Sequence, residues 1–272
     1  KCRKEKIKGK KYIMNNLSEN IKNLRNSTGA GFLDCKKALE ENNNDIDKAI
    51  VFLRKKGLTK AVKKSSRDAN EGAVGVYINK DKAVILEINT ETDFAAKNST
   101  FLEFMDKIGN YALEFNYSKN FKLNDFLECD FENKTISEHF VDTIAKIGEN
   151  IILRRINIII KEPDSEIFTY THNSYKSNVG KICVLLEAKV EKFDEETKQF
   201  GKNLCMHIAA SKPISLDVPD LDKELIEKEK DIQLETIKSS NKPDNIIEKI
   251  LEGKMKKFYS EVTFFNQPYI LD

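Results

Sequence analysis

The stretch AVILEINTETDFAAKN, residues 83–98, changes its period halfway and thereby indicates the architecture of the chain. Its first half reads as a buried strand, and an alternating strand that starts at Glu71 precedes it across the polar turn NKDK. Its second half leads into a helix with one apolar stripe, formed by Phe101, Phe104, Met105, Ile108 and Ala112. A hairpin followed by a helix predicts an α+β unit.

The same order of elements recurs later in the chain. Strands are expected over 167–172 and 180–190, and the helix after them carries an apolar ladder of Phe200, Leu204 and Ile208. Between the two units lie a polar segment, a helix around Phe140 and a strand over 151–160. The pattern predicts two similar α+β subdomains, with boundaries at 71–165 and 166–272.

Helices without strands flank these subdomains. Three short helices are expected over 17–57, the second over 32–41 with Leu33, Ala38 and Leu39 facing inward. The third starts at the cap Asp45 and ends with Gly57 as its C′ residue. At the other end, two helices over 222–258 predict a helical hairpin.

Two basic segments border the three-helix part. Residues 1–16 form a basic N-terminal extension, which reads either as the remnant of an organellar transit peptide or as a disordered tail. Residues 54–67, RKKGLTKAVKKSSR, lack an apolar ladder, so 58–70 is expected to be a solvated linker. Contact of this charge with a phosphate surface is the alternative.

Bulk composition excludes several classes of protein. The net charge is only +2, so the whole chain is not a general electrostatic binder of nucleic acid. Five scattered cysteines without a CxxC pair fit a reducing compartment, and three histidines far apart predict no metal site. No apolar run approaches the roughly 18 residues of a membrane helix.

The chain also lacks the motifs of phosphate loops, dinucleotide sites, zinc proteases and serine hydrolases. TGAGF at 28–32 follows a helix and not a strand, so a tight turn is expected there and not a phosphate site. We therefore expect no enzyme, no cofactor and no direct binding of nucleotide.

The junction at 91–94 raises the remaining question. Glu91 and Asp93 are candidates for an acid–base pair, but a cap on a short helix, by Thr92 or Asp93, is the simpler interpretation. Neither explains Phe94, an aromatic residue on a first helical turn between polar groups. Such a residue anchors either the core or a partner protein.

Five segments, in order and at fitting distances, resemble elongation factor Ts, the guanine-nucleotide exchange factor for elongation factor Tu. They are LRNSTGAGFLDCKKALEENNNDIDKAI (24–50), ILEINTETDFAAKN (85–98), IAKIGENIILRR (144–155), CMHIAASKP (205–213) and MKKFYSEVTFFNQPYILD (255–272). The resemblance runs from Leu17 to Asp272. It implies a ubiquitin-associated-like three-helix domain, a linker, and a core of two α+β subdomains.

The resemblance also implies a mechanism without covalent chemistry. The factor binds elongation factor Tu in its GDP-bound and nucleotide-free forms and promotes exchange of GDP for GTP. In the family, a TDF turn pushes between two helices of the partner's GTPase domain, and the aromatic enters an apolar gap. The partner's Mg²⁺ and phosphate-binding loop are thereby disturbed. The matching residues here are Thr92, Asp93, Phe94 and Ala95, where many relatives have Val in place of Ala95.

Further contacts are carried over with less direct matches. The N-terminal domain of the family touches the GTPase domain, and Arg25, Phe32 and Leu33 stand at matching positions. His172 falls near a contact histidine, although the insertion NSYKSN follows it. Many relatives continue beyond QPYILD with a further module, which is expected to be missing or cut here.

Two other function classes stay open at the level of sequence. The three-helix start suggests a ubiquitin-type adaptor, and the basic stretches suggest an RNA-associated accessory protein without exchange activity. For location, the basic residues 1–16 favour an organelle with bacterial-type translation, an apicoplast-type plastid ahead of a mitochondrion. Bacterial cytoplasm is the alternative.

Overall fold

The computed structural model describes residues 17–28, 30–64, 66–117, 121–238 and 243–270. The basic extension over 1–16 lies outside them. The chain divides into two compact units. The first runs up to Ile160 and includes Asn173–Lys181; the second comprises Lys161–His172 and the chain from Ile182 onward.

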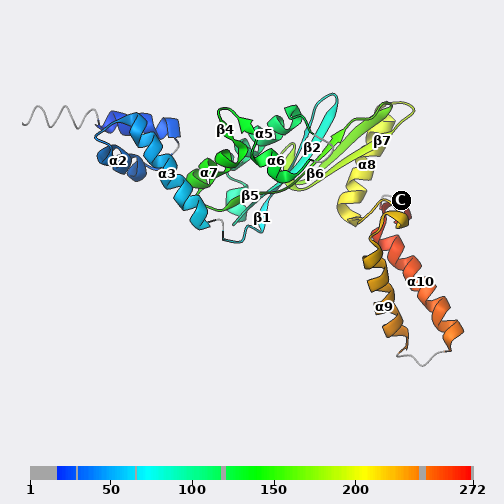
Figure 1. The fold of residues 1–272 in the computed structure, drawn as a ribbon. Helices are drawn as coiled ribbons and strands as arrows, with labels where there is room; N and C mark the ends of the chain where they lie inside the picture. Colours follow the sequence, from blue (N-terminus) through cyan, green and yellow to red (C-terminus); the bar gives the residue numbers. More distant parts are fainter. Residues whose placement is uncertain (1–16, 29, 65, 118–120, 239–242, 271–272) are drawn as a thin grey trace, which may run out of the picture. The chain divides into compact units, whose positions relative to one another are not determined.

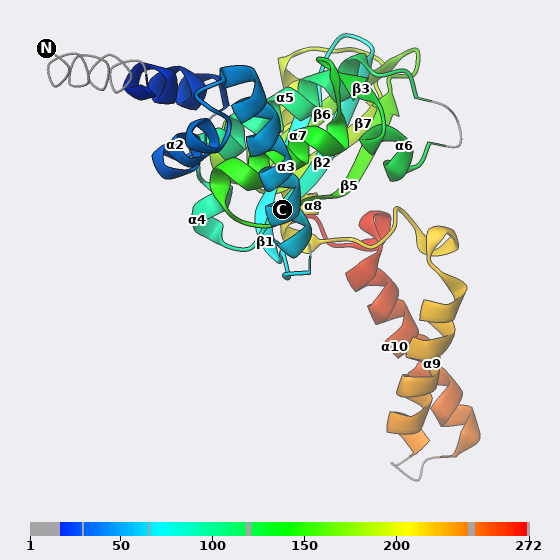
Figure 2. The same ribbon diagram turned by 60° about the vertical axis from the view of Figure 1, so that its left-hand side comes forward.

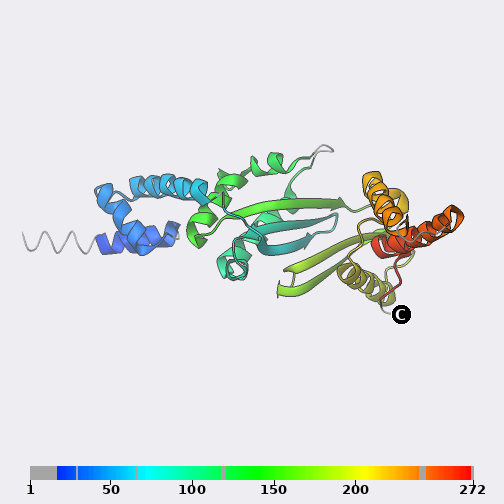
Figure 3. The same cartoon turned by 90° about the horizontal axis from the view of Figure 1, so that it is seen from below.

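Three helices open the first unit, as predicted (blue in Figures 1 and 3). They are residues 17–28, α2 Phe32–Glu41 and α3 Ile46–Lys64. The Asp45 carboxylate accepts a hydrogen bond from the Lys48 N–H at 3.0 Å, so the predicted cap of α3 is confirmed. Their small shared core is formed by Ile21, Leu24, Cys35, Ala38, Leu39 and Ala49.

The predicted end of the third helix at Gly57 is wrong, because α3 continues to Lys64. The predicted linker over 58–70 is therefore wrong for residues 58–64, which are helical. Gly57 is therefore an interior helical residue. A Cβ placed on it would lie 3.4 Å from the Cβ of Ala145 in α7 (Ile136–Ile147). A glycine pattern does not distinguish a helix C′ residue from a close helix–helix approach, and here α3 packs on α7 at this point.

Both predicted hairpins are present and share one sheet. The strands are β1 Glu71–Ile78, β2 Lys82–Thr90, β5 Ile151–Ile160, β6 Ser165–Lys176 and β7 Val179–Lys189. Their order is β5-β2-β1-β7-β6. Strands β1 and β2 pair antiparallel with Val76 opposite Ile85, and β2 pairs antiparallel with β5. The predicted boundaries of β5 are confirmed.

Helix α5 (Ser99–Glu114) packs on the β1–β2 hairpin, α7 contacts β5, and the two helices contact each other. The predicted stripe of α5 is buried in full, and its Gly109 lies against the ring of Tyr77 on β1. These side chains form the main core of the first unit. Members with no exposed surface include Val84, Ile88, Phe101, Met105, Ile108, Phe126 and Ile136.

The polar segment before α7 contains structure that the sequence did not indicate. Helix α6, Leu123–Leu127, buries Phe126 completely. A two-stranded ribbon, β3 Asp130–Phe131 and β4 Lys134–Thr135, leads into α7. The asparagines and lysines around Phe126 make this segment look like a polar loop, although Phe126 itself is fully buried.

The second unit repeats the hairpin-and-helix order with α8, Glu195–Ser211. Its inner residues are Gly201 and Cys205, and Gly201 lies against the ring of Phe168 on β6. The predicted inward position of Phe200 is wrong, because its side chain is 56% exposed. The buried face of α8 is turned by one residue, since only glycine permits the close contact with Phe168.

The predicted helical hairpin consists of α9, Lys223–Lys238, and α10, Asp244–Val262, which lie side by side (Figure 2). Short 3₁₀ turns stand before and after it, Val218–Asp220 and Phe264–Asn266. Within the described ranges, no helix combines the length and apolar character needed to cross a membrane.

Candidate functional site

The TDFA turn, Thr92–Ala95, connects the end of β2 to α5 through the one-turn helix α4, Asp93–Ala96 (Figure 2). Thr92 has extended backbone angles, and its hydroxyl oxygen accepts the Ala95 N–H at 3.3 Å. Thr92 is therefore the N-cap, and Asp93 is the first helical residue. Of the two expected caps, the threonine is confirmed and the aspartate is wrong.

Exposure separates the residues of this turn. The Phe94 side chain is 83% exposed, whereas Ala95 is 5% exposed and Ala96 is fully buried. Phe94 is thus not a core anchor. Ala95, which the resemblance assigned to the contact surface, faces the protein in this structure and supports the turn from below.

A carboxylate from the turn between α7 and β5 holds the N-cap in place. The Glu149 side chain accepts the Thr92 N–H at 2.9 Å and the Thr92 hydroxyl at 2.7 Å. The Thr90 hydroxyl donates to the Thr92 carbonyl at 2.7 Å. Each polar group of Thr92, backbone and side chain, therefore has a named partner.

The two hydrogen bonds from Thr92 to Glu149 form a clamp on the N-cap, and Glu91 is fixed next to this clamp. Its carboxylate accepts the Asn150 N–H at 2.6 Å and pairs with the Arg67 guanidinium at 3.4 Å. The Asn150 amide donates in turn to the Arg67 carbonyl at 2.7 Å. These contacts join the chain before β1 to the α7–β5 turn, and they give Glu91 a structural role instead of acid–base chemistry.

Asp93 pairs with Lys97 one turn later, at 2.8 Å. The hydrogen bond from Lys97 lowers the pKa of the Asp93 carboxyl, with smaller contributions from the charges of Lys97 and Lys181. The same bond raises the pKa of Lys97. Both groups are solvent-exposed, so the pair shapes the surface around Phe94 and contributes little to stability.

The other candidate contact residues are also on the surface. Arg25 and Phe32 are exposed, and Leu33 is 77% exposed, so its expected inward position is wrong. The predicted inward positions of Ala38 and Leu39 are confirmed, and α2 buries Cys35 with them, which places Leu33 on the opposite side. His172 belongs to the second unit, is exposed, and lies 3.0 Å from the Tyr170 hydroxyl through Nδ1.

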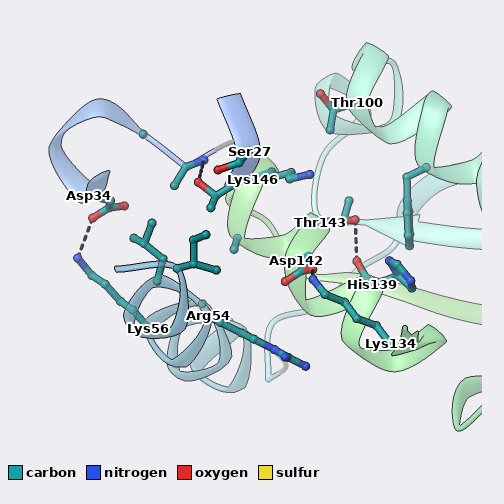
Figure 4. A pocket seen from close by; sticks show the side chains of 18 of the residues that line it. Ser27, Asp34, Arg54, Lys56, Thr100, Lys134, His139, Asp142, Thr143 and Lys146 are labelled. Atoms are coloured by element: carbon teal, nitrogen blue, oxygen red, sulfur yellow. Dashed lines mark hydrogen bonds and ion pairs between the residues drawn. The ribbon is translucent and has the colours of Figure 1, made fainter. Parts of the chain in front are cut away.

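A cavity of about 570 Å³ lies between the N-terminal helices, α5 and α7 (Figure 4). Several charged side chains of its lining form ion pairs with each other: Lys56 with Asp34 at 2.7 Å, Lys107 with Glu132 at 2.5 Å, and Lys134 with Asp142. These pairs leave no field of one sign to select a charged ligand. In the described part of the chain, no group of three or more potential ligands forms a metal site.

Comparison with known proteins identifies the family. A family model described as elongation factor TS matches residues 91–272. The chain is 42% identical over 252 residues to elongation factor Ts of Brucella anthropi, which covers 93% of this chain and 81% of that relative. The proteins of the same name from Brucella ovis and Brucella canis are 40% identical over the same shares. The chain belongs to the elongation factor Ts family. These relatives are bacterial.

Proposed function

We propose that this protein binds elongation factor Tu in its GDP-bound form and promotes release of GDP and exchange for GTP. The TDFA turn enters the partner's GTPase domain, Phe94 occupies an apolar gap between two helices, and the Mg²⁺ and phosphate site is disturbed. No covalent bond forms or breaks. Membership of the family supports the exchange role, and the surface of the turn supports this mechanism.

One observation carries the proposal: Phe94 is the exposed residue of a turn whose neighbours are buried or hydrogen-bonded. A large aromatic side chain gains roughly 1.5–3 kcal/mol when it leaves water. Because the turn is already fixed, little of that gain is lost to ordering the chain. An exposed aromatic on a rigid support is the usual form of an interface anchor.

Phe94 alone does not account for exchange. Lowering the partner's affinity for GDP by about 10³-fold requires about 4 kcal/mol of coupling free energy. By linkage, bound GDP must lower the partner's affinity for the factor by the same ratio. The difference must come from a broad interface, above the standard ~1,600 Å². We assign the N-terminal contact to Arg25, Phe32 and Leu33, which are all exposed. We assign a contact in the second unit to the exposed His172.

We also propose that the partner belongs to a bacterial-type translation system, because the relatives are bacterial. The expectation of an organelle, an apicoplast-type plastid or a mitochondrion, rests on residues 1–16, which lie outside the described residues. Bacterial cytoplasm is its alternative. Immunolocalisation in the source cell distinguishes them.

The direct test is release of a fluorescent GDP analogue from elongation factor Tu, measured by stopped flow against increasing factor concentration. The proposal predicts acceleration that saturates, and excess unlabelled GDP should weaken binding of the factor to the partner in the same proportion. No acceleration with the cognate partner would refute the exchange function. RNA or ubiquitin binding in place of exchange would support one of the two other classes.

A further inference from the structure

We propose that Glu149 is a positioning residue of the TDFA turn: its carboxylate sets the direction of Phe94 by accepting hydrogen bonds from both polar donors of Thr92. This inference rests on the proposed function. Glu149 lies 57 positions from Thr92 in the sequence. We infer that it holds the exposed ring of Phe94 in one direction.

The geometry of the clamp is bidentate. One carboxylate oxygen accepts the Thr92 N–H at 2.9 Å and the other accepts the Thr92 hydroxyl at 2.7 Å. The second bond orients the hydroxyl so that its oxygen faces the Ala95 N–H, at 3.3 Å. Glu149 therefore fixes the N-cap and, through it, the four-residue helix that carries Phe94. Hydrogen bonds to a charged acceptor are about twice as strong as neutral ones.

The clamp matters because α4 has few other constraints on its outer side. A helix of four residues is too short to hold itself, so its direction depends on its caps and on the buried Ala95 and Ala96. Because Phe94 itself is exposed, packing in the core does not fix the direction of its ring. If the cap loosens, the ring samples several directions, and fewer of them match an apolar gap of fixed shape.

The support of Glu149 is itself anchored. Gly148 ends α7 with φ of 90°, and its carbonyl accepts a bond from Lys64. Asn150, which is buried, donates its backbone N–H to Glu91 at 2.6 Å. The residues on both sides of Glu149 are thus tied to the end of α3 and to the chain before the TDFA turn. The carboxylate projects from a fixed backbone.

The test compares Glu149→Gln with Thr92→Val, Thr92→Ser and the matched surface change Glu114→Gln. Glutamine keeps the shape of Glu149 but replaces one acceptor oxygen with a donor, so it cannot accept from both groups of Thr92. Valine removes only the hydroxyl, and serine restores it. Glu114 is exposed at the far end of α5 and receives the same chemical change.

The readouts are the maximal GDP release rate at saturating factor, the factor concentration at half-maximal rate, and amide hydrogen exchange of a peptide over 89–98. For Glu149→Gln we expect the maximal rate to fall about tenfold, which is the effect of losing one charge-assisted bond of roughly 1.5 kcal/mol. Exchange of the peptide should speed up by a similar factor. Thr92→Val should resemble it, Thr92→Ser should recover the rate, and Glu114→Gln should match wild type.

A thermodynamic cycle with Phe94→Ala separates positioning from general destabilisation. If Glu149 acts through the ring, Glu149→Gln should change the maximal rate little once Phe94 is absent. Equal losses with and without Phe94, or an unchanged maximal rate in Glu149→Gln, would overturn the positioning role while wild-type exchange remains. No acceleration by wild type would refute the proposed function instead. Thermal unfolding of each variant identifies any that fail to fold.

Discussion

Helices α5 and α8 follow two similar hairpins, yet they are buried to different degrees. Both contain a glycine against an aromatic ring of the preceding hairpin, Gly109 on Tyr77 and Gly201 on Phe168. Helix α5 also buries an aromatic and aliphatic stripe and joins the large core of the first unit. The core cluster beneath α8 has Phe168, Val184 and Cys205 as its buried members, with partly buried residues such as Tyr170 and Leu186 packed against them.

This difference suggests a division of labour within one repeated architecture. The well-packed first hairpin gives the TDFA turn a rigid base, because α4 contacts β1, β2 and α5. The second keeps apolar side chains such as Phe193 and Phe200 on its surface. Exposed apolar residues of this kind suit binding to a partner and contribute little to a core. The first hairpin therefore supports the exposed Phe94, and the second adds further exposed apolar surface.

The largest expected effect is on stability. Phe101→Ala, in the larger core, should destabilise the protein by about 4 kcal/mol, because a fully buried ring leaves a cavity. Phe168→Ala, beneath α8, should lower stability by about 2 kcal/mol, since the smaller core can collapse around the gap. Urea unfolding followed by circular dichroism measures both. Equal losses would contradict the difference in packing.

Alanine substitutions at two glycines test the same difference in packing between the two cores, with a smaller expected loss of stability. A Cβ at Gly109 would lie 2.1 Å from Cε2 of Tyr77, and one at Gly201 would lie 2.1 Å from Cδ1 of Phe168. Alanine gains up to about 1 kcal/mol of helix propensity at either position. We expect Gly109→Ala to lose about 2 kcal/mol net, because Tyr77 is held in a dense core. Gly201→Ala should lose less, about 1 kcal/mol, because Phe168 lies in the smaller core and has more room to shift. The reverse order in thermal unfolding would show that the second core is the stiffer one.

The smallest expected effects are changes in the pKa of two carboxylates at helix starts, Asp93 and Asp194. The pKa of Asp194, the N-cap of α8, is lowered to about 2, first by a hydrogen bond from Lys192 and then by the Thr197 N–H. The pKa of Asp93 is lowered mainly by Lys97 alone. Lys97→Gln should therefore return the pKa of Asp93 toward ~3.9, whereas Lys192→Gln should leave part of the shift at Asp194.

Carboxyl-carbon NMR titration measures these values. Because both folded pKa values lie below the unfolded ones, each carboxylate contributes stability above about pH 4 and loses it as the pH falls through the folded value. A return of both pKa values to the ordinary range would show that the backbone N–H at α8 contributes nothing.

Periodic elements were predictable because the buried face repeats along the chain. The sequence indicated the bounds of α2 and β5 and the stripe of α5 correctly. The mismatch between an aromatic residue and its polar neighbours singles out Phe94, and its exposure excludes the interpretation as a core anchor. These inferences use neighbours within a few positions.

Three of the failures involve partners that are distant in sequence. The pattern around Gly57 predicts a helix end because its partner, Ala145, lies in α7 and is distant in sequence. The ladder of α8 predicts a buried Phe200 because the sequence does not show the contact of Gly201 with Phe168. Glu149 was missed although its segment, IGEN, was among those carrying the resemblance. Single-chain periodicity carries no information about which loop faces which turn.

The most direct test of the account is the maximal GDP release rate at saturating factor for Phe94→Ala, with Phe32→Ala as a matched loss of another exposed ring. We expect Phe94→Ala to lower the maximal rate about 10- to 100-fold, the equivalent of burying one Phe, with a smaller change in half-saturating concentration. Phe32→Ala should raise the half-saturating concentration and leave the maximal rate near wild type. The account is contradicted if Phe94→Ala weakens binding but releases GDP at the wild-type rate once saturated.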